Sequence, residues 1–238
     1  MIKVFQFLQR RPDVDWYAFR SYVGDEFVNA ALTGTAGELV DRIVTNYVLE
    51  HDFRPTTNAQ GHRWDAVVEL YVADERRALE FLAADRTALD ESDRAAWIAV
   101  ASSMVVDEQL VYDRGPVPGA AKIFGIFKNS LPVGAPLSRE QTLREWKGHG
   151  RRMDAKRLPD LIEKFTRNIA LSEVHADDPR YDYDGASIVW CNTIEIAEQL
   201  YKDYDIEQAV IPSSEAMGST AGDCVYLRTD EVERFRRS

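Results

Sequence analysis

The sequence predicts an α+β protein in which one βαββαβ unit occurs twice along a chain of 238 residues. Two observations support this prediction: three short blocks recur in the same order at nearly constant spacing, and a stretch rich in proline and glycine separates the two sets. The blocks pair Lys3–Leu8 with Lys122–Phe127, Asp41–Leu49 with Glu163–Leu171, and Trp64–Ala66 with Tyr183–Gly185. Identity between paired blocks is low, which indicates two old and diverged copies.

The separating stretch runs from Arg114 to Gly119 and contains two prolines and two glycines. Such residues prevent a continuous helix or a central strand. We therefore expect a first unit over residues 1–113, a linker over 114–120 and a second unit over 121–238.

The first copy is predicted to alternate strands and helices in the order of the ferredoxin-like unit. Apolar residues at three- and four-residue steps indicate its first helix, with Asp13 or Asp15 as the N-cap. Its strands are rich in β-branched and aromatic residues. We expect strands over 2–9, 42–49, 65–73 and 104–112, and helices over 15–31, 74–84 and 92–103.

The second copy repeats this order. Its long helix begins at Ser138–Gln141, which has the residue types and spacing of a capping box. The segment 205–222 replaces the second helical stretch of the first copy. We expect strands over 121–128, 164–171, 185–191 and 223–229, and helices over 138–162 and 193–203.

The strand patterns predict how the two units combine. Val4–Leu8 and Ala66–Tyr71 are apolar on both faces, whereas a sheet covered by helices on one side alone would alternate with polar residues. The sheet of the other copy is the available cover. We therefore expect two tandem ferredoxin-like units that form one barrel within the chain, with helices outside.

Composition limits the partners. Forty acidic residues against 29 Lys and Arg give a formal charge of −11, which disfavours nucleic acid and anionic membranes. No apolar stretch approaches the length of a membrane span. Cys191 and Cys224 have no zinc-site or disulfide spacing, so we expect buried thiols in a cytoplasmic protein. No nucleotide-binding or metal-binding motif occurs, so neither a cofactor nor a metal is expected.

Several of these residues together resemble one family, the EthD-type domain of the dimeric α/β-barrel proteins. The matching features are the first strand with Phe19 in the helix after it, Trp146 followed by His149-Gly150, Asn46 and Asn168 in the second strands, and Tyr183-Asp184-Gly185. The first copy departs from the pattern, with Phe27 in place of a histidine and Ala66 in place of a glycine. The resemblance implies a pocket between each sheet and its helices, open to small, mostly apolar ligands. Members include lyases, isomerases, polyketide cyclases, cofactor-free monooxygenases and heme enzymes, so the fold selects no reaction.

Proton transfer is the chemistry that the candidate residues favour. His149 is the first candidate acid or base, because only histidine titrates near neutral pH without help; a structural histidine at a helix end is the alternative. Asn168 and its counterpart Asn46 lie within apolar strands, where the amide needs either a ligand oxygen or the backbone as partner. Trp146, Tyr183 and Trp190 are expected to line the pocket of the second copy.

A reserve site is expected in the first copy. If the strand face with Glu69 and Tyr71 is enclosed, burial would raise the pKa of Glu69 into the range of a general acid or base. Tyr22, Glu26 and Tyr47 would complete a polar cluster, and the substrate would contact Tyr22, Asn46, Tyr47 and Tyr71 there. The alternative is that Glu69 pairs with an arginine or reaches the rim.

These observations predict a cofactor-independent enzyme that acts on a small hydrophobic, oxygenated or aromatic compound by acid/base proton transfer, as a lyase, dehydratase, isomerase or cyclase does. A binding protein without turnover and a cofactor-free monooxygenase are the alternatives. The fused pair of units allows a monomer, and a homodimer of two chains stays open.

Overall fold

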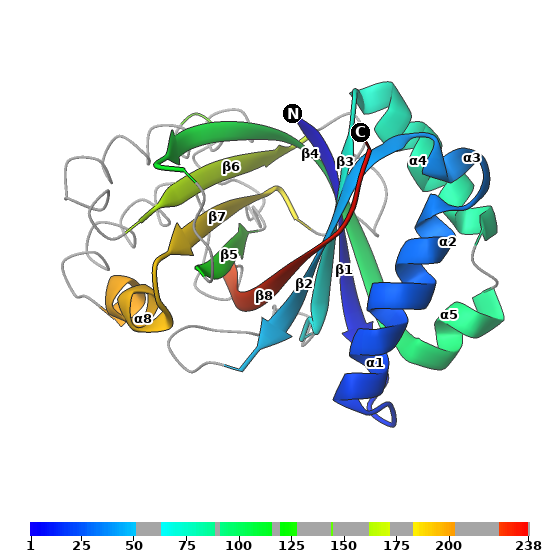
Figure 1. The fold of residues 1–238 in the computed structure, drawn as a ribbon, viewed down its shortest axis with the longest axis horizontal. Helices are drawn as coiled ribbons and strands as arrows, with labels where there is room; N and C mark the ends of the chain where they lie inside the picture. The colour runs from blue at the N-terminus through cyan, green and yellow to red at the C-terminus, as the bar shows by residue number, and fades with distance from the viewer. Residues whose placement is uncertain are drawn as a thin grey trace, which may run out of the picture.

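A computed structural model describes residues 1–50, 63–88, 91–115, 120–127, 144, 162–171, 183–202 and 224–237 (Figure 1). Eight strands form a closed antiparallel barrel in the order β1-β3-β2-β8-β5-β7-β6-β4. The strands are β1 (Ile2–Arg10), β2 (Val40–Leu49), β3 (Ala66–Val72), β4 (Ile98–Asp113), β5 (Ala121–Phe127), β6 (Lys164–Ala170), β7 (Gly185–Cys191) and β8 (Cys224–Arg236).

Each half of the barrel has the strand order of a ferredoxin-like unit. The first half runs β4-β1-β3-β2 and the second runs β8-β5-β7-β6. The halves meet at two seams, where β2 pairs with β8 and β4 pairs with β6. The predicted fold class, two tandem ferredoxin-like units in an intrachain dimeric α/β-barrel, is therefore confirmed. The predicted boundaries of the units stay a prediction.

The two closing strands are longer than expected. β4 begins at Ile98, where a helix was expected, because its first residues pair with β1 as far as Arg10. β8 continues to Arg236 instead of ending near residue 229, because its second part pairs with β2 of the other half. Charged residues make up much of that second part. The apolar run from which the strand was predicted therefore ends before the strand itself does.

The strand register relates the two halves residue by residue. Lys3 lies opposite Tyr71 and Val106, and Lys122 lies opposite Trp190 and Thr229. In the same way, the second strands place Asn46 opposite Val67 and Asn168 opposite Ala186. Lys3 is thus equivalent to Lys122, Tyr71 to Trp190 and Asn46 to Asn168, as the repeated blocks predicted.

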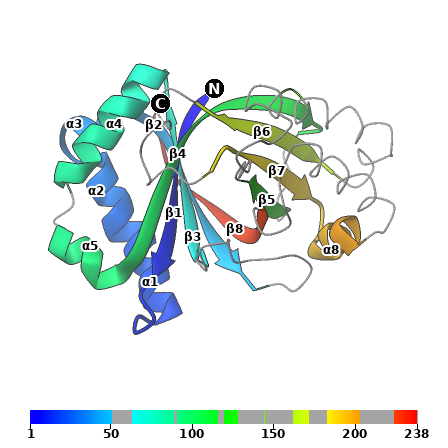
Figure 2. The same ribbon diagram turned by 180° about the vertical axis from the view of Figure 1, so that it is seen from behind.

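Helices cover the outside of the first sheet (Figures 1 and 2). Their buried side chains, including Phe19, Phe27 and Phe81, pack on the outer residues of β1, β2 and β3. Asp15 is the N-cap of the first helix, since its Oδ1 accepts from the backbone N–H of Tyr17 at 2.8 Å. The expected helix over 15–31 is divided by a π-helical turn. The segments are α1 (Trp16–Tyr22), η1 (Val23–Phe27), α2 (Val28–Leu32), α3 (Gly34–Gly37), α4 (Glu75–Ala88) and α5 (Glu91–Trp97).

Outside the second sheet lies α8 (Ile194–Lys202), whose Ala197 packs on Ile123, Val189 and Cys191. The expected helix over 138–162 falls almost entirely outside the described residues. No helix in the described part of the chain is long and apolar enough to cross a membrane.

Side chains from both halves fill one part of the barrel interior. Phe5 and Phe7 of β1 meet Phe124 of β5, and the Phe5 and Phe124 ring centroids are 6.0 Å apart. Trp64 Nε1 donates to Tyr183 Oη at 2.6 Å, which joins the segments before β3 and β7. The charged residues of the interior lie at the other end of the barrel.

Candidate functional site

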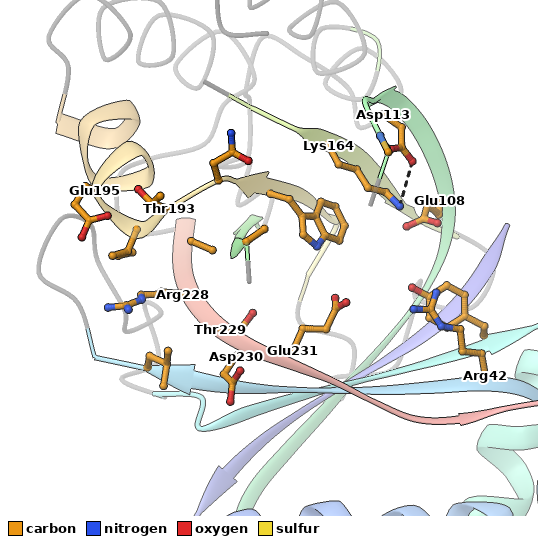
Figure 3. A pocket seen from close by; sticks show the side chains of 18 residues that line it. Arg42, Glu108, Asp113, Lys164, Thr193, Glu195, Arg228, Thr229, Asp230 and Glu231 are labelled. Atoms are coloured by element: carbon orange, nitrogen blue, oxygen red, sulfur yellow. Dashed lines mark hydrogen bonds and ion pairs between the residues drawn. The ribbon is translucent and has the colours of Figure 1, made fainter. Parts of the chain in front are cut away.

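A pocket of about 930 Å³ opens at the end of the barrel where β3 and β7 finish (Figure 3). It reaches from the barrel interior, over the start of β5, to the start of α8. Both halves contribute to its walls. The described lining residues include Arg42, Tyr71 and Glu108 from the first half and Lys164, Trp190, Arg228 and Glu231 from the second.

Beneath this pocket, five charged side chains form one continuous chain of ion pairs. Glu69 occupies the middle, with Lys3 Nζ 2.8 Å from its Oε2 and Lys122 bonded to its Oε1. Lys3 also pairs with Glu108, and Lys122 pairs with Glu231. The two lysines and Glu69 are fully buried, whereas the end carboxylates of Glu108 and Glu231 are 12% and 34% exposed and line the pocket.

The pKa of Glu69 moves in the direction opposite to the one expected. Burial alone would raise it, but the charges of Lys122 and Lys3 and their hydrogen bonds outweigh burial and hold the pKa well below its usual range. The carboxylate also accepts from Asn46 Nδ2 at 3.0 Å and from Tyr71 Oη at 3.3 Å. With four donors around it, Glu69 is a fixed anion rather than a proton donor at neutral pH.

The pKa values of two neighbours of Glu69, Lys122 and Tyr71, are both raised. Burial lowers the pKa of Lys122, yet Glu69 and Glu231 together raise it above its usual value. Burial and the charge of Glu69 raise the pKa of Tyr71 well above its usual value, so its hydroxyl stays a donor.

Two aromatic rings separate the buried lysines from the rim. Lys3 Nζ lies 4.5 Å from the Tyr71 ring centroid, and Arg42 stacks on the same ring at 4.7 Å. At the equivalent position, Trp190 lies between Lys122 at 4.9 Å and Lys164 at 5.1 Å. Tyr71 and Trp190, both expected to contact ligand, thus line the pocket with cations close to each ring.

Asn46 and Asn168 face the barrel interior and are fully buried. Each amide donates to the backbone oxygen opposite it, Val67 at 3.0 Å and Ala186 at 3.4 Å. Both amide groups therefore donate to the backbone, which is the partner expected if the asparagines are structural. Within the described residues neither Oδ1 atom accepts a hydrogen bond.

The reserve cluster expected in the first copy does not form. Tyr22 and Tyr47 lie on the outer face of the sheet, under the helices, whereas Glu69 points inward. The Tyr22 ring stacks on Trp97 with centroids 4.9 Å apart, and Tyr47 Oη donates to the backbone oxygen of Arg20 at 3.1 Å. Glu26 is exposed, because its position on the helix faces away from the sheet. The sheet stands between Glu69 and the two tyrosines, so these side chains do not meet.

Of the remaining predicted site residues, Tyr183 lies within the described part of the chain. Tyr183 packs on Phe7, with ring centroids 5.2 Å apart, in the apolar part of the interior. It is not among the described residues that line the pocket. His149 and Trp146 lie outside the described residues, so their roles stay predictions.

Four members of the charged chain were not among the predicted site residues: Lys3, Lys122, Glu108 and Glu231. A signal for the lysines was present, because the repeated blocks align a lysine with a lysine on the interior face of an otherwise apolar strand. The glutamates carried no such signal, because Glu108 lies in the polar run Asp107–Gln109 and Glu231 lies beyond the predicted end of its strand at residue 229.

The outer face of the second sheet differs from that of the first. Across β6, β7, β5 and β8, neighbouring strands place Arg167, Ser187, Gly125 and Tyr226 side by side. The equivalent row of the first half consists of Thr45, Val68, Gln6 and Ser103. A Cβ atom at Gly125 would lie 3.2 Å from the Tyr226 ring, so a larger residue would require the ring to shift slightly.

Comparisons with known proteins support the fold alone. No family model matches the chain, and no curated protein matches its sequence significantly. An anthrone oxidase-like protein of known structure superposes with a TM-score of 0.64 over 100% of this chain and 94% of its own, at 9% identity. A provisionally assigned monooxygenase from Fusobacterium nucleatum superposes with a TM-score of 0.53 over 100% and 97%, also at 9% identity. The EthD-type resemblance stays a prediction.

Proposed function

We propose that the chain is an enzyme for a small hydrophobic, oxygenated or aromatic compound, and that it works by acid/base proton transfer without a bound cofactor. The supporting observation is the pair of carboxylates, Glu108 and Glu231, on the walls of the large pocket. Each is bonded to a buried lysine, which fixes its position. A carboxylate held within reach of a substrate can accept a proton from an acidic C–H or O–H group.

The charged chain behind these carboxylates gives them a rigid support. Lys3 and Lys122 share Glu69 as a common partner, so each end carboxylate is bonded to a lysine that is itself held in a fully buried ion pair. Preorganised groups of this kind lower the cost of reorientation during proton transfer. We assign Glu69 to this support instead of to the transfer step.

His149 keeps the role of acid or base in the proposal, as the sequence predicts. Asn168 faces the barrel interior, so any substrate oxygen that it orients has to enter the barrel. A binding protein without turnover is the alternative, and it predicts ligand binding that is independent of both carboxylates and of His149.

Anthrone is a suitable first probe, since one structural neighbour is named anthrone oxidase-like. Its methylene group lies between two aromatic rings and exchanges a proton when a base forms the enolate. We expect the protein to accelerate deuterium exchange at this group under anaerobic conditions, and Glu231→Gln or Glu108→Gln to reduce the acceleration by about 100-fold or more. Exchange is followed by NMR.

Glu80→Gln is the matched control, because Glu80 lies on the exposed side of α4. His149→Gln is expected to abolish exchange while leaving binding nearly intact. Oxygen uptake with anthrone in air would instead indicate the monooxygenase. If neither anthrone nor other aromatic carbon acids exchange faster than in buffer, the proposed chemistry is wrong.

A further inference from the structure

We propose that the large pocket holds a site for an organic anion on its α8 side, with Arg228 as the recognition residue. A carboxylate attached to an apolar or aromatic body is the ligand class that this site would take. The inference goes beyond the proposed function, because it concerns binding and requires no turnover.

The first support is the set of partners around the pocket. Every other charged residue described on its walls already has a donor or an opposite charge. The pairs are Arg42 with Glu233, Glu108 with Lys3, Asp113 with Lys164, Glu195 with Thr193, Asp230 with Arg20, and Glu231 with Lys122. Arg228 forms no hydrogen bond or ion pair with any described residue. Among the charged groups described on the pocket walls, the one without a described partner is thus the Arg228 guanidinium, which can only donate, so a ligand that binds it has to be an acceptor.

The second support is the surroundings of Arg228. In the strand register it lies between Leu49 of β2 and Ile123 of β5, so an apolar side chain flanks its stem on either side. Leu49 and Ile194 also line the pocket. Figure 3 shows Arg228 on the α8 side, near Thr193 and Glu195. A guanidinium beside apolar walls suits a carboxylate on a hydrophobic body.

The third support comes from the equivalent position in the first half. The register places Val105 where the second half has Arg228. Val105 is fully buried in the core beneath the helices. The fold therefore accepts a purely apolar residue at this position, and the positive charge of Arg228 is a property of the second half alone.

Glu195 is the internal competitor for this cation. Its pKa is lowered first by a hydrogen bond with Thr193 and, among weaker causes, by the charge of Arg228. No ion pair joins Glu195 to Arg228. A ligand carboxylate would bind closer to the guanidinium than Glu195 does, and removal of the Glu195 charge would favour it.

The test uses 2-naphthoate and its neutral counterpart 2-naphthalenemethanol as probes, with binding to the full chain measured by ligand-observed NMR and calorimetry. We expect 2-naphthoate to bind more tightly than the alcohol despite the net charge of −11. Arg228→Gln should weaken naphthoate binding about tenfold or more, because a hydrogen bond to a charged group is lost. Arg76→Gln removes the same charge from the exposed side of α4 and should leave binding unchanged.

Two further variants sharpen the test. Arg228→Lys keeps the charge and should lose less affinity than Arg228→Gln, and it remains informative if the glutamine variant does not fold. Glu195→Gln should tighten naphthoate binding. Equal affinity in the wild type and in Arg228→Gln, equal affinity for acid and alcohol, or no naphthoate binding up to about 10 mM would each overturn the proposal. If the wild-type protein binds naphthoate as expected but does not accelerate deuterium exchange of anthrone, the proposed function is wrong and the anion site stands.

Discussion

The two halves of the barrel share one topology and one strand register, yet their outer faces differ. Helices close the first face, where Phe19 and Phe27 pack on fully buried residues of β1 and β2. In the second half the equivalent face carries Arg167, Ser187 and Tyr226 around Gly125. The equivalent positions of the first half are Thr45, Val68, Gln6 and Ser103, so the row is largely polar in both halves, and the charge of Arg167 and the ring of Tyr226 distinguish the second.

Inside the barrel the two halves resemble each other more closely in their charged residues. Lys3 and Lys122 occupy equivalent positions, and Glu108 and Glu231 each lie two residues beyond the partner of those lysines on the closing strand. Among the five charged residues, Glu69 alone has no charged counterpart. Glu69 of β3 corresponds to Ile188 of β7, so a single carboxylate binds both lysines.

The largest effect is expected from Glu69→Ile, which gives both halves an isoleucine at this position. Both buried lysines lose their common partner, and breaking a buried ion pair in this way costs about 3 to 5 kcal/mol of unfolding free energy. Urea unfolding of the variant beside Glu80→Gln measures the loss. A change below about 1 kcal/mol would show that the central ion pairs contribute little.

The pH dependence of the same variant gives a second readout. Because the folded pKa of Glu69 lies below its ordinary value of 4.5, its contribution is complete above that pH and is lost as the pH falls toward the folded pKa. The stability difference between wild type and Glu69→Ile should therefore be constant near neutrality and shrink in acid. A difference that grows below pH 4.5 would contradict the direction of the shift.

The symmetry itself predicts a rescue. In the double variant Glu69→Ile with Ile188→Glu, the carboxylate moves to the equivalent site on β7, next to Lys122 and across from Lys3. We expect this variant to recover about half or more of the stability lost in Glu69→Ile. If the double variant is less stable than the single one, the two positions are not equivalent inside the barrel.

A smaller effect compares the two asparagines. Either Asn46→Ala or Asn168→Ala removes a buried amide, at a cost of about 1 to 3 kcal/mol. Asn46 should contribute more, because it also donates to the charged Glu69 at 3.0 Å, whereas Asn168 donates to Thr166 at 3.2 Å. Thermal unfolding ranks the two, and a larger loss for Asn168→Ala would reverse this assignment.

Much of the fold was predictable because it depends on local periodicity and on the repeat. Strand β7 has the bounds expected from its sequence, and the aligned blocks predicted which positions are equivalent. The charged chain was not predictable in the same way. Its members lie on β1, β3, β4, β5 and β8, and only the strand order of the closed barrel brings them together.

Glu69 illustrates the limit of pattern alone. Alternation along β3 placed its side chain on the same face as Val67 and Tyr71, and in the structure this side chain is fully buried; burial by itself would have raised its pKa. Its partners Lys3 and Lys122 are remote in sequence, and their two positive charges reverse the direction. The sign of such a shift depends on neighbours that become visible only in the folded barrel.

The most direct test is a crystal structure of the full chain with 2-naphthoate bound. Our account predicts ligand density in the pocket at the end of the barrel, with the carboxylate within hydrogen-bonding distance of Arg228 and the rings toward Leu49 and Ile194. Density between the first sheet and the α1 helix, where Phe19 and Tyr22 now pack, would contradict the placement of the ligand site at the end of the barrel.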